Sequence, residues 1–119
     1  MITSPTAKVT AILDTLAEEW LKDRPNLGDR RGINEGSCGE FADEAETLLG
    51  DAGFDVETVD LEDVAALKGL EFPNHHHTFL KVLVDARPWY FDAECTEGVA
   101  MAWSIPFLRR VTPFAQAAD

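Results

Sequence analysis

The sequence has no long apolar run and little positive charge. No apolar segment approaches the roughly 20 residues needed to cross a bilayer, which excludes a membrane-spanning helix. The 119 residues carry 10 basic and 22 acidic side chains, a formal net charge of -12. Because a protein this acidic repels phosphate backbones and anionic lipids, we expect neither nucleic-acid nor membrane binding. The same charge favours solubility or a basic protein partner, and it does not distinguish between them.

The sequence also lacks a secretory signal and a CxxC pair, which bears on the cellular compartment and on the state of the cysteines. The N-terminus lacks the basic and apolar segments of a secretory signal, so we expect a cytoplasmic protein. There are only two cysteines, Cys38 and Cys95, and they form no CxxC pair. In a reducing compartment we expect both to be free thiols, although a Cys38–Cys95 disulfide stays open as an alternative. A hydrophobic fraction of 45% is enough for a core without disulfides or a structural metal.

Apolar spacing in the first half predicts two helices. Steps of three and four between apolar residues predict one helix from Pro5 to Lys22. The segment from Asn26 to Gly36 is rich in glycine, asparagine and charge, which is typical of a loop. A second amphipathic helix is expected to begin near Ser37 or Cys38 and to end between Gly50 and Gly53.

The second half predicts a small antiparallel sheet. Strands are expected from Phe54 to Leu61, from Thr78 to Val84 and from Trp89 to Phe91, the last two forming a hairpin. Glu62 to Leu70 is interpreted as a short helix or a lid, and Val99 to Phe114 as one more short element. Helices followed by an antiparallel sheet define an α+β fold, and residues 1–119 are expected to form one domain.

Cys38 is the first candidate for chemistry, because it opens the second predicted helix. A helix N-terminus presents unpaired N–H groups and the positive end of the dipole, and both favour thiolate over thiol. The neighbouring Gly36 and Gly39 leave space for a substrate carbonyl. The alternative is that Cys38 is a small buried apolar residue, as free cysteines often are.

His77 and Asp92 are candidates for the base and for the group that orients it. The predicted hairpin brings the residue before its first strand next to the residue after its second, so the two side chains should be neighbours. Alternation places both on one face of the sheet, which we expect to be the more open face. Leu80, Val82 and Phe91 belong to the opposite face, which we expect to be buried.

Two segments resemble the transglutaminase-like branch of the papain-like superfamily. They are Gly36-Ser37-Cys38-Gly39-Glu40-Phe41-Ala42, followed by a helix, and His77-Thr78-Phe79 with Trp89-Tyr90-Phe91-Asp92. The resemblance covers Gly36 to Glu94, with residues 1–35 as a preceding helix and loop. It implies a papain-like core in which the cysteine helix packs on the sheet. It also implies Cys38 as nucleophile, His77 as general base and acid, and Asp92 as orienter. The Cys38 N–H is the candidate donor of an oxyanion hole, and Asn34 is a second candidate that the family pattern does not specify.

Other residues near these positions admit more than one interpretation. A metal site could draw on Cys38, Asp92, Glu94, Cys95 and the His75-His76-His77 run, but consecutive strand residues point to alternating faces, so we expect no metal and no cofactor. Cys95 is expected to be buried, and Glu94 to be a solvated carboxylate. Trp103 and Gly36 are candidates for substrate binding, and Ser104 to Phe107 for a wall of the same cleft.

Two functional hypotheses follow from these residues. The first is a cysteine hydrolase, a peptidase or amidase and alternatively an acyltransferase, that acts on a peptide or protein through a thioester acyl-enzyme. The second is a papain-like binding module without catalysis, whose acidic surface engages a basic protein partner.

Overall fold

The sheet has three antiparallel strands in the order β1-β2-β3. The computed structural model describes residues 5–61 and 77–111, apart from the side chains of Trp103 and Val111. The strands are β1 (Asp55–Asp60), β2 (Thr78–Val84) and β3 (Arg87–Phe91). Asp85 and Ala86 connect β2 to β3 with positive φ angles of 53° and 65°, the backbone of a tight two-residue hairpin turn. The predicted α+β class, the β2–β3 hairpin and the strand before it are confirmed.

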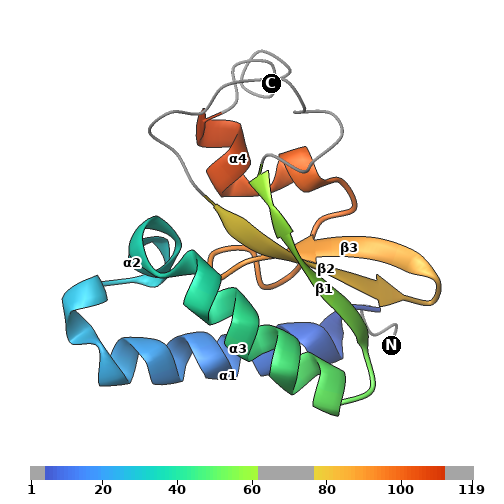
Figure 1. The fold of residues 1–119 in the computed structure, drawn as a ribbon, viewed down its shortest axis with the longest axis horizontal. Helices are drawn as coiled ribbons and strands as arrows, with labels where there is room; N and C mark the ends of the chain where they lie inside the picture. The colour runs from blue at the N-terminus through green and yellow to red at the C-terminus, as the bar shows by residue number, and fades with distance from the viewer. Residues whose placement is uncertain (1–4, 62–76, 112–119) are drawn as a thin grey trace.

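One face of the sheet is covered by helices α1 (Ala7–Asp23) and α3 (Cys38–Asp51), which lie side by side (Figure 1). Their apolar faces pack against Leu80, Val82 and Phe91, the alternate residues of β2 and β3 that point toward them. This is the face that alternation predicts to be buried. The helix side of this core is formed by Val9, Leu13, Leu16, Ala17, Trp20, Phe41, Ala42, Ala45 and Leu49.

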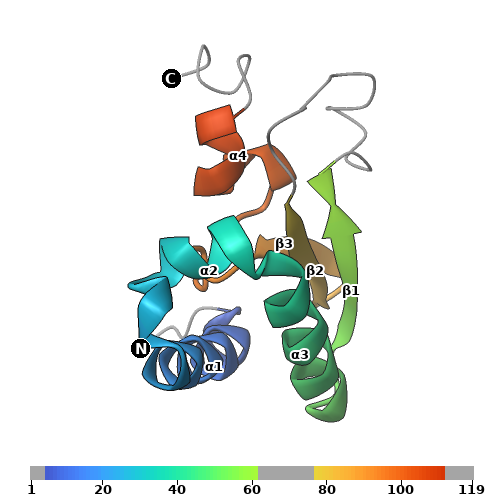
Figure 2. The ribbon, with the colours of Figure 1, turned by 60° about the vertical axis from the view of Figure 1, so that its left-hand side comes forward.

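The opposite face is partly covered, contrary to expectation. The C-terminal elements η4 (Ala102–Ser104) and α4 (Pro106–Val111) lie at one end of the sheet (Figure 2) and pack against Phe79 of this face. Phe79 therefore lies in a second buried cluster, with Leu61, Ile105, Phe107 and Leu108 as further members. Leu83, toward the other end of the same face, stays exposed. The prediction of an open face is wrong at the His77 end, because a segment distant in sequence returns to cover it.

A short helix, α2 (Arg30–Gly36), occupies the segment predicted to be a loop, after the 3-10 turn η1 (Pro25–Leu27). The Asp29 side chain caps it by accepting a hydrogen bond from the Gly32 N–H at 3.0 Å. Ile33 and Asn34 are buried, so the helix is held by packing despite its glycines. Local composition favours a loop here, and tertiary contacts override it.

The remaining boundaries differ little from those predicted. Helix α1 begins at Ala7 rather than Pro5, and the Thr6 hydroxyl donates to the Glu97 carbonyl oxygen at 3.0 Å. The interpretation of Glu62 to Leu70 as a helix or lid lies outside the described residues. Within the described ranges, no helix is long and apolar enough to span a membrane.

Candidate active site

Cys38 is the first residue of α3, as predicted. Helices α2 and α3 meet at Ser37, whose N–H donates to Ile33 and whose carbonyl accepts from Phe41. The first N–H groups of α3 therefore have no carbonyl acceptor in their own helix. The Thr78 N–H donates to the Cys38 sulfur at 3.4 Å, and the Gly39 N–H also contacts it. Two backbone donors thus converge on the thiol from a helix terminus and from a strand.

His77 and Asp92 are neighbours across the hairpin, as predicted. Their Nε2 and Oδ2 atoms are 3.0 Å apart, and the two side chains are 0% and 2% exposed. A carboxylate only accepts, so we assign the proton at this contact to Nε2. The other ring nitrogen, Nδ1, is buried and has no nitrogen or oxygen partner in the described part of the chain. His77 also interacts with the Cys38 thiol, so the histidine links the cysteine to the aspartate.

The electrostatics favour a charged Cys38–His77 pair. Burial raises the pKa of the Cys38 thiol, but His77 and the N–H groups of Thr78 and Gly39 outweigh burial, so this pKa is lowered. Burial lowers the pKa of His77, but Asp92 and Cys38 outweigh it, so this pKa is raised. Both shifts stabilise thiolate and imidazolium relative to the neutral groups.

Asp92 is itself fixed by the turn that follows β3. Its Oδ1 atom accepts from the N–H groups of Glu94 at 2.9 Å and Cys95 at 2.8 Å. One carboxylate oxygen thus holds the backbone, and the other faces His77. This division fixes the orientation of the imidazole and the position of its Nε2 proton.

Glu94 joins three segments around the site and is not the solvated carboxylate that the sequence suggested. Its side chain is 18% exposed and forms a two-pronged ion pair with Arg110 of α4, at 2.8 and 3.2 Å. It also accepts from the Asn34 amide of α2 at 3.0 Å. Sequence reasoning missed this contact, although Arg109-Arg110, an isolated basic pair in an acidic chain, was a signal for a buried acidic partner.

Phe107 covers the histidine ring. The two rings stack with centroids 4.1 Å apart and an interplanar angle of 20°. Phe107 lies on α4, and the Arg110 guanidinium lies over its ring, 5.5 Å from the centroid. The expected wall from Ser104 to Phe107 therefore includes a residue in direct contact with the candidate base. Sequence reasoning did not assign that contact.

The other candidates have different outcomes. Cys95 is buried, as expected, and burial together with Asp92 and Glu97 raises its pKa to about 12. It forms no disulfide with Cys38. A Cβ added at Gly36 would meet open space, consistent with room beside the thiol, and the Trp103 side chain lies outside the described part of the structure. One proton of the buried Asn34 amide is engaged by Glu94, so only its second is left for the predicted oxyanion role.

The described residues hold no group of three histidine, cysteine or acidic side chains placed for a metal ion. His75 and His76, which entered the metal hypothesis, lie outside the described ranges. Comparisons with family models, with curated proteins and with solved structures give no match for this chain.

Proposed function

We propose that the protein is a cysteine hydrolase with Cys38 as nucleophile, His77 as general base and acid, and Asp92 as orienter. The observation that carries the proposal is the convergence of three residues from distant segments. The His77–Asp92 contact of 3.0 Å orders the ring, and the Cys38 sulfur accepts the Thr78 N–H beside it. A base that is oriented by a carboxylate and in contact with a thiol of lowered pKa is the arrangement that thiol catalysis requires.

The first half of the proposed reaction forms an acyl-enzyme. The Cys38 thiolate attacks an amide carbonyl carbon, an S–C bond forms, and the carbonyl electron pair moves onto oxygen. When the tetrahedral intermediate collapses, the C–N bond breaks and His77 gives its Nδ1 proton to the departing nitrogen. The product is a thioester on Cys38, and His77 is left neutral with its Nε2 proton still directed at Asp92.

The second half resolves the thioester. His77 Nδ1 takes a proton from water as the water oxygen attacks the thioester carbon, and the C–S bond then breaks to regenerate the thiolate. An amine in place of water gives acyl transfer. The Cys38 N–H at the start of α3 is the first candidate donor to the developing oxyanion, and Asn34 is the second. Asp92 keeps its contact with the His77 Nε2 atom throughout and stabilises the imidazolium.

The resemblance to the transglutaminase-like branch of the papain-like superfamily supports the same assignment. In that family a cysteine at a helix N-terminus meets a histidine and an aspartate from neighbouring strands. The order of Cys38, His77 and Asp92 along this chain is compatible with that pattern. We propose a peptide or isopeptide bond as the substrate class, because amide hydrolysis uses both the nucleophile and the proton donor.

The test is the pH dependence of iodoacetamide alkylation at Cys38, followed by mass spectrometry. Cys38 should react well below the ordinary thiol range near pH ~8.5, and His77→Ala should remove this shift. Cys95 is the internal control, because its pKa is raised to about 12 and it is buried. If Cys38 in the folded protein needs the same pH as an unfolded thiol, the proposal is wrong.

The burial of His77 favours a second candidate, a binding module without catalysis. The ring is fully buried under Phe107, as expected of a histidine that serves only to hold the fold together. A binding module needs no activated thiol. Ordinary Cys38 reactivity, together with a protein complex that survives Cys38→Ala and dissociates in high salt, would favour this second candidate over the hydrolase.

A further inference from the structure

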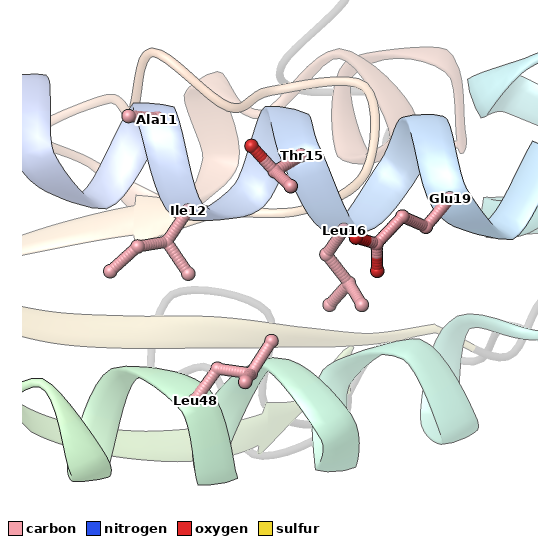
Figure 3. A pocket seen from close by; sticks show the side chains of 6 residues that line it. All are labelled: Ala11, Ile12, Thr15, Leu16, Glu19 and Leu48. Carbon is pink, nitrogen blue, oxygen red and sulfur yellow. The ribbon is translucent and has the colours of Figure 1, made fainter.

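A second surface feature lies between α1 and α3, on the helical side of the molecule. It is an open groove of about 410 Å³ whose lining is mostly apolar. Figure 3 shows Ile12 and Leu16 of α1 pointing toward Leu48 of α3 across this groove. Ala11, Thr15 and Glu19 complete its lining. At 40% exposure, Leu48 is one of three large apolar side chains that are exposed within the described residues, and the triad does not involve it.

The two walls of the groove differ in charge. The α1 wall carries both signs, with Lys8 near its start and Lys22 next to Glu19 and Asp23 near its end. Its remaining acidic side chains, Asp14 and Glu18, pair with Arg30 of α2.

The α3 wall carries one sign only. Glu44 and Asp51 lie one turn to either side of Leu48, and Glu40 lies one turn further. Helix α3 contains no lysine or arginine at all. Glu44 is fixed in place, because the Trp20 indole donates to it at 2.8 Å. The groove therefore has an apolar floor, one mixed rim and one acidic rim.

We propose that this groove binds a basic amphipathic helix of a partner protein. The apolar positions of that helix, spaced i, i+3, i+4 and i+7, would contact Ile12 and Leu48, above the buried Leu16 at the floor of the groove. Its lysines and arginines would follow the flank that faces α3 and meet Glu40, Glu44 and Asp51. The lining from Ala11 to Glu19 spans about 12 Å along α1, which matches about two helical turns.

Charge decides against a second copy of this chain as the occupant. Each copy carries a net charge of -12, so pairing α3 with an acidic face would bring like charges together. A helix suits the groove better than a strand, because both walls are helices and offer side chains rather than a free strand edge. The proposal does not depend on catalysis, and the Cys38→Ala variant should bind equally well.

The probe is a fluorescent leucine–lysine peptide of about 18 residues with leucines on one helical face. A peptide of the same composition with the leucines scrambled is its control. Anisotropy gives the affinity of the full chain for each peptide, and amide NMR shifts locate the bound one. We expect shifts at Ile12, Leu16 and Leu48, and affinity that falls as salt rises.

Leu48→Lys tests whether the peptide binds in the groove, and Leu83→Lys is the matched control outside it. Both positions are exposed, at 40% and 37%, and both changes add the same charge. Leu48→Lys should weaken peptide binding about tenfold or more, and Leu83→Lys should leave it near wild type. Thr15→Lys, also in the groove, replaces Leu48→Lys if that variant does not fold.

Three results would overturn the proposal. The first is equal binding of the scrambled peptide, which indicates only general attraction to an acidic surface. The second is an equal effect of the two leucine variants. The third is a dimer, detected by sedimentation, that Leu48→Lys converts to a monomer. That result would show that a second copy of the chain occupies the groove. A failure of Cys38 alkylation would remove the proposed hydrolase and leave this groove unaffected.

Discussion

Asp92 has two partners of different kinds, and each uses a separate oxygen. Oδ1 accepts from the backbone of the turn, and Oδ2 contacts His77. Replacing the whole side chain would therefore damage both the turn and the site. Replacing only the charge separates the two roles, because an asparagine keeps one acceptor oxygen for the backbone.

Asp92→Asn should lower the pKa of His77 and raise that of Cys38. Burial lowers the His77 pKa, and Asp92 opposes it together with Cys38, so removing the Asp92 charge moves the balance toward burial. NMR titration of the imidazole gives the first shift, and alkylation rates give the second. An unchanged His77 pKa in Asp92→Asn would contradict the assigned role.

The same variant has a defined effect on stability. A histidine whose pKa is raised in the folded state contributes stability that is fully present below its unfolded pKa of about 6.5. This contribution is lost as pH rises through the folded pKa. The wild type should therefore exceed Asp92→Asn in free energy of unfolding by the most below pH ~6.5, and the difference should shrink at higher pH.

Residue-level reasoning selected Cys38, His77 and Asp92 as candidates from local signals, and only the resemblance implied that Cys38 approaches the other two. The cysteine stands between a glycine-rich segment and an amphipathic run, and a short hairpin brings the ends of its two strands together. The burial of His77 could not be found in this way. It depends on Phe107, thirty residues further along the chain, and nothing near either residue encodes their contact.

At the scale of elements, Glu94 connects α2, the turn after β3 and α4. Its ion pair with Arg110 is two-pronged and partly shielded, with side chains 18% and 32% exposed. Such pairs contribute more than exposed ones, because their geometry is fixed and water screens them less. The elements that carry Asn34 and Phe107 are thereby tied to the segment that carries Asp92.

A double-mutant cycle of Glu94→Ala and Arg110→Ala should give a coupling energy of at least about 1 kcal/mol. The measurement is the free energy of unfolding in urea for the four proteins. Arg31 and Glu35 are the matched control, since they form an exposed ion pair within α2. Their cycle should give at most about 0.5 kcal/mol. Equal coupling in the two cycles would mean that the Glu94–Arg110 pair stabilises the fold no more than an exposed ion pair does.

Gly32→Ala should destabilise the protein by about 1–3 kcal/mol. A Cβ at this position would collide with the carbonyl oxygen of Leu27, so α2 could not keep its contact with η1. Gly50→Ala is the control, because a Cβ there meets open space within α3 and should stabilise by about 0.5–1 kcal/mol. Thermal unfolding compares the two, and a neutral Gly32→Ala would show that α2 can shift.

The same glycine explains why α2 escaped prediction. Gly32 and Gly36 favour a loop by their intrinsic preferences, yet Gly32 is required by a close approach and not by a turn. Asp29 was a cap signal, and Ile33 was an apolar position four residues later. Without knowledge of the packing, these two signals do not outweigh the glycines.

At the scale of the whole molecule, the negative charge is concentrated in one segment of the chain. From Glu40 to Asp60 the chain contains eight acidic residues and no basic one, and these residues form α3 and β1. Glu46 accepts from the Thr58 N–H at 3.1 Å, so one carboxylate occupies a backbone donor of β1. The acidic side chains along this strand also oppose pairing with strands of other molecules.

Salt should stabilise the protein by screening this repulsion. Raising ionic strength from about 0.01 M to 0.1 M shortens the Debye length from about 30 Å to 10 Å, and the thermal midpoint should rise. In a double variant, Asp43→Lys with Asp55→Lys, each substitution changes the charge by +2, so the net charge goes from -12 to -8. Its midpoint should respond less to salt, and an equal response would assign the effect to something other than net charge.

The segment from Asp92 to Glu97 binds parts of the chain that are far apart in sequence. It receives the Thr6 hydroxyl, the Arg30 guanidinium, the Asn34 amide and the Arg110 guanidinium. Closing the chain over such long sequence separations costs conformational entropy, and only the folded molecule offsets that cost. The groups that lower the pKa of the Cys38 thiol include His77 and Thr78, which also lie about forty residues away. An unfolded chain therefore has an ordinary thiol at Cys38, and the lowered pKa belongs to the folded molecule.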